Sequence, residues 1–171
     1  MISTGDNKSF AIAAEITGTP NGWLLGKFRF VLHGHVCGNW NDDADLRGCY
    51  GWLKDFAEKP RLRFEPGLMD LSPDNVFSNL VLPVIEQSGQ ERIPELYSDT
   101  FSRFHISHLG MSSFDRVTMV LIESPERQRC VWKEGNDIHD DVFPPGHMQT
   151  VASEFCVLLE REAASLGVLL Q

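Results

Sequence analysis

Alternating side chains from Trp23 to Leu32 constrain the fold more than any other feature of the sequence. Lys27 and Arg29 lie on one face of this segment, and the opposite face carries four apolar side chains, Leu24, Phe28, Phe30 and Leu32. This pattern is typical of a strand with one buried face. An earlier alternation, from Phe10 to Ile16, is separated from it by the turn formers of residues 18–22. We therefore predict that the two strands pair as an antiparallel hairpin.

Three further segments have the spacing of helices. Apolar side chains recur from residue 46 to 56 at intervals of three and four. The motif Ser72-Pro73-Asp74 favours a helix start, because serine caps the free amides and proline fits the first turn. Residues 148–166 carry the longest apolar stripe, and Gly167 is expected to end that helix.

The other segments are assigned to strands or loops. Residues 117–122 are apolar on both faces, which is typical of a central strand, and residues 129–133 follow a turn as its partner. Residues 101–107 also alternate, whereas 86–99 and 135–146 are polar and are predicted to be loops. The order of elements indicates an α+β domain, with a mainly antiparallel sheet of about five to six strands and three helices packed on it.

Length and composition are those of an ordinary globular protein. The 171 residues are expected to form a single domain, 1–171, with residues 1–8 frayed at the N-terminus. No apolar run approaches the roughly 18 residues of a membrane span, and the N-terminus lacks a secretory signal, so a cytoplasmic location is expected. A net charge of -9 argues against nucleic acid as a partner, because phosphate contacts need clustered cations.

Histidine and cysteine side chains gather around the predicted strand end. His33, His35 and Cys37 are spaced as on one face of a strand, and Cys49 follows on the next helix. Together they could form a tetrahedral zinc site, which makes a small metal-dependent enzyme or a zinc-stabilised domain the alternative function. The spacing is not a common zinc pattern, and Gly34 interrupts the strand. We therefore predict no cofactor, and buried thiols at the four cysteines of the chain.

The sequence contains no catalytic motif of high specificity. Ser107, Ser112 and Ser113 lie near His105 and His108 in the sequence, but no GxSxG elbow is present and no base can be assigned to a nucleophile. The chain is therefore not predicted to be an enzyme.

Two acidic pairs remain open to more than one interpretation. Asp42-Asp43 and the acids of His139-Asp140-Asp141 could each supply oxygen ligands to a hard cation or two carboxylates for acid–base chemistry, although neither has calcium-loop spacing. A solvated acidic surface is the simpler role, and Asp42 or Asp43 is expected to cap the helix that begins near residue 46. Trp40, in the first acidic loop, belongs either to core or lid packing or to a protein interface.

Three strings stand out as word patterns: GWLLGKFRFVLHGHVCGNWNDDADLRGCYGWLKDF at residues 22–56, FEPGLMDLS at 64–72 and SRFHISHLGMSSFDRVTMVLIE at 102–123. Together they resemble a family of immunity proteins from bacterial polymorphic-toxin and contact-dependent competition systems. The resemblance spans roughly residues 10–160. It implies a protein that binds a cognate toxin domain and neutralises it by occlusion.

The acidic surplus is compatible with that role, since it would steer encounter with a cationic toxin such as a nuclease. The candidate partner-binding residues are Trp40, Asp42 and Asp43 in one acidic loop, and Asp140 and Asp141 in the other.

Overall fold

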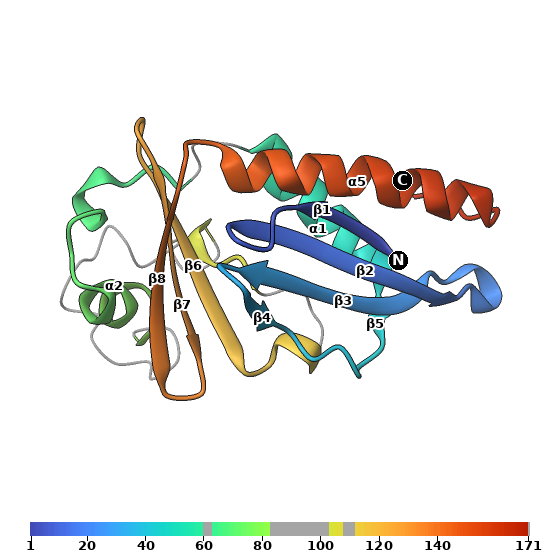
Figure 1. Ribbon diagram of the computed structural model, residues 1–171, viewed down its shortest axis with the longest axis horizontal. Coiled ribbons are helices and arrows are strands. Elements are labelled where there is room, and N and C mark those ends of the chain that lie inside the picture. The colour runs from blue at the N-terminus through green and yellow to red at the C-terminus, as the bar shows by residue number, and fades with distance from the viewer. Residues whose placement is uncertain (60–62, 83–102, 108–111, 171) are drawn as a thin grey trace. The chain divides into compact units, whose positions relative to one another are not determined.

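The computed structural model describes residues 1–59, 63–82, 103–107 and 112–170 (Figure 1). The chain divides into two compact units. Unit 1 comprises Met1–Pro60, Leu109–Arg116 and Gly146–Gln171, and unit 2 comprises Arg61–His108 and Val117–Pro145. The grouping of the whole chain into one domain stays a prediction.

Unit 1 contains a five-stranded antiparallel sheet. In the order β1-β2-β3-β4, with β5 also paired to β3, its strands are β1 (Ile2–Gly5), β2 (Phe10–Gly18), β3 (Leu25–Leu32), β4 (His35–Cys37) and β5 (Ala44–Asp45). The hairpin of β2 and β3 pairs Phe28 with Ala14 and Phe30 with Ile12, so their apolar side chains share one face. The predicted hairpin is confirmed.

Strand β1 overturns the expectation of a frayed N-terminus. Ile2 pairs with Ala14 and Thr4 pairs with Ile12, and Ile2 is only 7% exposed. The Thr4 hydroxyl donates a hydrogen bond to the backbone oxygen of Val151, 3.2 Å away. Four residues with two inward side chains make too short a pattern to recognise in the sequence, and pairing with β2 orders them instead.

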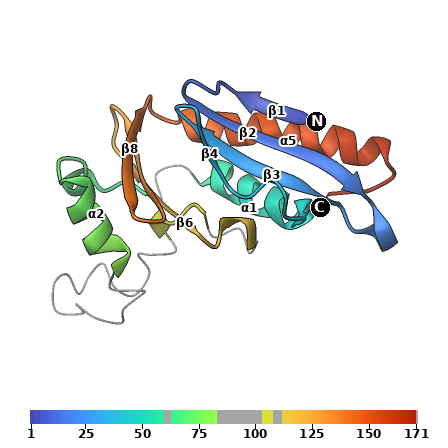
Figure 2. The same ribbon diagram turned by 60° about the horizontal axis from the view of Figure 1, so that its bottom comes forward.

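Two helices of unit 1, α1 (Leu46–Glu58) and α5 (His147–Ser165), pack together and on one face of this sheet (Figures 1 and 2). Phe28 of β3 meets Phe155 of α5 edge to face, with 5.8 Å between ring centroids. The cap of α1 was assigned wrongly to Asp42 or Asp43. Asp45 holds that position, and its Oδ1 accepts a hydrogen bond from the Arg47 amide at 3.0 Å.

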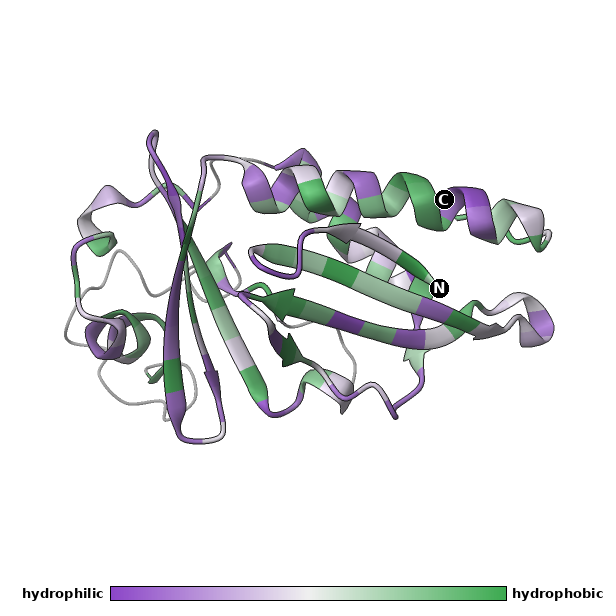
Figure 3. Cartoon of the chain, viewed as in Figure 1, coloured by the Kyte–Doolittle hydropathy of each residue, from purple (hydrophilic) through white to green (hydrophobic). Residues whose placement is uncertain are grey.

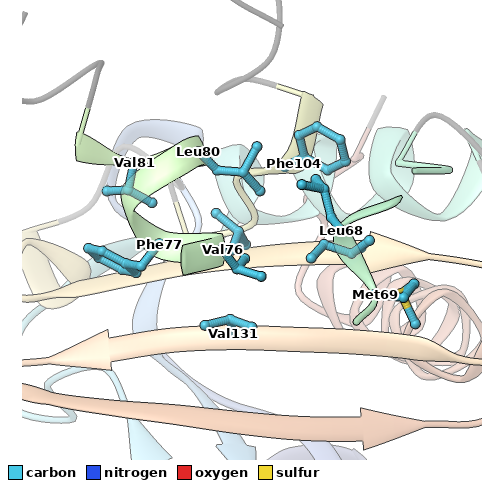
Figure 4. Packing of buried hydrophobic residues seen from close by; sticks show 10 residues of the cluster. Leu68, Met69, Val76, Phe77, Leu80, Val81, Phe104 and Val131 are labelled. Carbon is cyan, nitrogen blue, oxygen red and sulfur yellow. The ribbon is translucent and has the colours of Figure 1, made fainter. Parts of the chain in front are cut away.

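Unit 2 contains a three-stranded antiparallel sheet in the order β6-β7-β8 and one described α-helix, α2 (Pro73–Leu80). The strands are β6 (Val117–Glu123), β7 (Gln128–Glu134) and β8 (Asp137–Phe143). Ser72 caps α2 as predicted, accepting from the Asn75 amide at 3.3 Å. Side chains of α2 pack against Val131 of β7 within an apolar cluster (Figure 4).

Residues 117–122 form most of β6, which is buried on both faces as expected; β6 pairs with β7 and also forms isolated bridges to Phe64 and His105. Another prediction for unit 2 is wrong. Residues 135–146 were expected to be a loop, yet they contain β8, which is mostly hydrophilic in Figure 3. The predicted strand at 101–107 is reduced, within the described part, to a bridge between His105 and Val120. The predicted loop at 86–99 lies outside the described residues.

The α+β class and the antiparallel pairing are confirmed. The strands are divided between two sheets, however, and do not form the one sheet that was expected.

Candidate functional site

The acidic loop of residues 39–44 is held in a fixed conformation. The Asn39 amide donates to the Ser113 backbone oxygen at 3.0 Å, and the Asp42 amide donates to the Asn39 oxygen at 3.1 Å. Gly38 precedes the loop with φ of +102°, and a Cβ atom there would lie 2.9 Å from the ring of Phe114. Only glycine fits this position without strain, so the direction in which the chain enters the loop is fixed.

Trp40 lies half-buried in this loop, beside strand β3. The Cζ atom of Arg29 is 4.4 Å from the centroid of the Trp40 ring, which is a cation–π arrangement. Arg29 alternates along β3 with Phe28 and Phe30, whose side chains point toward the helices. The Arg29–Trp40 pair therefore lies on the sheet face opposite α1 and α5.

The two aspartates of the loop make different contacts. Asp43 forms an ion pair with Lys27 of β3, at 2.9 Å between Oδ1 and Nζ, and Lys27 also donates to the Asn41 oxygen at 3.0 Å. Asp42 accepts a longer bond from Ser112, at 3.5 Å. The structure thus brings Trp40, Asp42 and Asp43 together on one surface of unit 1.

Asp140 and Asp141 lie on β8 of unit 2, and both carboxylates have partners within that unit. Asp140 accepts two hydrogen bonds of 2.8 Å from the Nε and Nη2 atoms of Arg129. Asp141 accepts one of 2.7 Å from the indole nitrogen of Trp132. These residues belong to a strand, and their contacts within unit 2 give them a structural role that the sequence pattern did not indicate.

Arg129 connects β8 to the segment that precedes α2. Its Nη1 atom lies 3.2 Å from the backbone oxygen of Leu68, 3.0 Å from that of Met69 and 2.7 Å from that of Leu71. The arginine is 5% exposed, so these carbonyl groups have little access to water.

The proposed zinc ligands do not form a site. Cys37 and Cys49 are buried, whereas His33 and His35 are exposed at the turn between β3 and β4. Burial raises the pKa of the Cys49 thiol, which disfavours the thiolate that a metal requires. Within the described residues, no group of three or more His, Cys, Asp or Glu side chains could hold a metal ion. The metal alternative is therefore not favoured.

Ser107 has a structural environment. It is 3% exposed, and its hydroxyl donates to the Val117 oxygen at 2.8 Å and accepts from the Met119 amide at 3.1 Å. His105 lies 2.8 Å from the same hydroxyl. These backbone contacts tie residues 105–107 to β6. His108 lies outside the described residues.

A second polar cluster, not anticipated from the sequence, joins α1 to α5. Tyr50 is 1% exposed and donates its hydroxyl hydrogen to Glu160, and its hydroxyl oxygen accepts a hydrogen bond of 3.1 Å from the Lys54 ammonium. Burial, followed by the hydrogen bond to Glu160, raises the pKa of Tyr50. Tyr50 and Lys54 are four apart on α1, which is the only signal of this contact in the sequence.

No helix in the described part of the chain is long and apolar enough to cross a membrane.

Comparison with known proteins identifies two similarities. The family described as immunity protein 42 matches residues 1–157. A crystal structure of CdiI from Burkholderia dolosa AUO158 is similar in fold, with a TM-score of 0.70 and 14% sequence identity, over 92% of this chain and 99% of that one. No curated protein matches the sequence.

Proposed function

Because the chain belongs to the immunity protein 42 family, whose members neutralise toxins, we propose that it binds its cognate toxin through the loop of residues 39–44 and blocks it by occlusion. The observation that carries this proposal is the fixed loop itself, which holds a half-buried tryptophan against Arg29 and carries two aspartates close to it in the sequence. A specific interface covers on the order of 1,200–2,000 Å² and depends on a few such anchors.

A loop held in place before binding favours tight association. Its backbone hydrogen bonds to Asn39 and Ser113 already restrict the chain, so little further ordering is required when the toxin binds. Tryptophan adds a large contact area at low entropic cost. Occlusion requires no chemical step, and we propose that the protein has no turnover of its own.

The charge of the chain supports a cationic toxin. A net charge of -9 raises the rate of encounter with a basic partner such as a nuclease, most strongly at low salt. Within the loop, Lys27 neutralises Asp43, so Asp42 carries most of the local negative charge. We place the protein in the cytoplasm of the cell that makes it, where it meets a toxin that has entered.

Asp140 and Asp141 form a second candidate surface. The side chain of Asp140 is 32% exposed, and Val142 on the same strand is 50% exposed, so part of β8 is available to a partner. Their carboxylates already accept bonds from Arg129 and Trp132, however. The loop of residues 39–44 is therefore the first candidate and β8 the second.

Charge reversal tests the first candidate. The variant Asp42→Lys/Asp43→Lys should slow association with the cognate toxin domain by about tenfold at low salt, and weaken the salt dependence of the rate. The control is Glu154→Lys/Glu162→Lys, which makes the same change in net charge at two exposed positions on α5.

Comparing these two variants distinguishes the effect of the loop charges from the effect of the net charge of the protein. Stopped-flow association rates at several salt concentrations should fall much more for the loop variant than for the control. Equal rates in the two variants would remove the loop from the interface. Death of cells that make both the toxin and this protein would refute the immunity function itself.

A further inference from the structure

Arg29 has a buried donor that the described part of the chain leaves without an acceptor. This donor is its Nε atom, which has no hydrogen-bond partner among the described residues. A guanidinium has five N–H donors, and native proteins satisfy nearly all their buried donors. The Trp40 ring, with its centroid 4.4 Å from Cζ, covers one face of the group but accepts no conventional hydrogen bond from it.

Acceptors of the loop of residues 39–44 make bonds to other residues. Asp43 and the Asn41 oxygen both bind Lys27, and Asp42 bonds to Ser112. Across the hairpin, Arg29 pairs in register with Ala13, whose side chain offers no acceptor. The unpaired Nε donor of Arg29, next to the Trp40 ring, is therefore available to an acceptor from a partner protein.

We propose that Arg29, supported by the Trp40 ring, is the anchor that receives a carboxylate of the cognate toxin. This inference rests on the proposed function and specifies the chemistry of the same surface. The planar fork of arginine binds a carboxylate through two parallel hydrogen bonds, and stacking on Trp40 holds the fork before the toxin arrives. Tryptophan and arginine are also the residues most enriched among those that dominate binding energy.

The negative and positive charges would act at different stages of binding. The acidic surplus acts at a distance and attracts any cationic toxin. The cation at Arg29 acts on contact and selects a toxin with an acidic side chain at the matching position. A toxin without that side chain would leave the guanidinium desolvated and unpaired, so the same residue excludes non-cognate toxins.

The test uses Arg29→Met, which keeps the apolar stem beneath Trp40 and removes every donor. Titration calorimetry with the cognate toxin domain should show affinity weakened by about 30-fold or more. The loss should persist at high salt, since a desolvated contact is poorly screened. Arg161→Met, at an exposed position on α5, is the matched control and should bind like the wild type.

The melting temperature of Arg29→Met separates a binding role from a structural one. The variant loses the cation–π contact with Trp40 but no hydrogen bond of the described chain, and it no longer buries an unpaired donor, so it should melt close to the temperature of the wild type. Arg29→Lys should recover only part of the affinity, because an ammonium cannot form the two parallel bonds.

Substitutions in the toxin can identify the carboxylate that Arg29 would bind. Replacing each Asp and Glu of the toxin by its amide should identify one position whose effect is strong with wild-type Arg29 and absent with Arg29→Met. Arg29→Met binding within twofold of the wild type, or the absence of any such coupled position, would overturn the inference. Failure of the wild-type protein to bind the toxin would instead refute the proposed function.

Discussion

Replacing Arg129 by methionine should destabilise unit 2 strongly, and the size of the effect can be derived from its contacts. The side chain makes two bonds of 2.8 Å to Asp140 and approaches three backbone oxygens through Nη1. Since Nη1 carries two hydrogens, the three carbonyl contacts are worth about two full bonds. The variant therefore loses about four charge-assisted hydrogen bonds, each worth roughly 1.5–3 kcal/mol.

The simple sum of roughly 6–12 kcal/mol is an overestimate. The Asp140 side chain is 32% exposed and can be rehydrated, and methionine fills part of the vacated volume. Removing one partner of a buried pair typically costs 3–5 kcal/mol, and we expect a loss of about that size in the free energy of unfolding. Arg127→Met is the matched control. Its ion pair with Asp70 is exposed, with the two side chains 46% and 90% accessible, and should be worth less than about 1 kcal/mol.

Urea unfolding followed by circular dichroism gives the difference as a shift in midpoint at constant slope. Hydrogen exchange of the β7 and β8 amides shows whether the loss lies in unit 2. A change below about 1 kcal/mol for Arg129→Met, or equal effects for Arg129→Met and Arg127→Met, would refute the structural role of the Arg129–Asp140 pair.

Two further predictions concern unit 1 and its thiols. Gly38→Ala should lower the melting temperature and weaken toxin binding, because the added Cβ would clash with Phe114 and φ is +102°. The control is Gly135→Ala, where φ is +62° and the surrounding space is open. It should lower the melting temperature but leave toxin binding unchanged. Burial, assisted by Glu160, raises the pKa of Cys156 from 9.0 to about 12. Native Cys156 should resist iodoacetamide at pH 8, and rapid native alkylation would contradict this. Between pH 9 and 12 this thiol ionises only in the unfolded protein, so it should contribute a fall of about 1.4 kcal/mol per pH unit to the free energy of unfolding, and Cys49, whose pKa burial also raises, adds to that fall.

The sequence predicts those elements whose pattern repeats within one segment. The hairpin of β2 and β3 alternates over many residues, and α5 carries its apolar stripe through 19 residues. Strand β8 has no such pattern, because three of its seven residues are aspartates. Two of these acids are paired by Arg129 and Trp132 on the neighbouring strand. Cross-strand partners thus decide the structure of β8, and a single segment does not contain that information.

The candidate surface was predictable to a similar extent. Trp40 was identified because it lies in a polar loop, and the structure places it with Asp42 and Asp43. The role of Arg29 was missed, because its sequence position shows only that it lies on the outward face of a strand. Its stacking on Trp40 depends on how the loop returns along β3, where β5 pairs with Leu25 and Gly26. The path of the loop depends on contacts between segments that are distant in the sequence, so it produces no periodic pattern there.

Unit 1 is assembled from three separate stretches of chain, and this has a consequence for the time at which it can fold. The loop of residues 39–44 is held by Ser113 from the second stretch, and Phe28 is covered by Phe155 from the third. A ribosome delivers these stretches one after another, so the core of unit 1 is complete only after α5 has emerged. We expect a chain truncated before that helix to leave the apolar face of the β2–β3 hairpin uncovered and therefore not to hold unit 1 in its folded form.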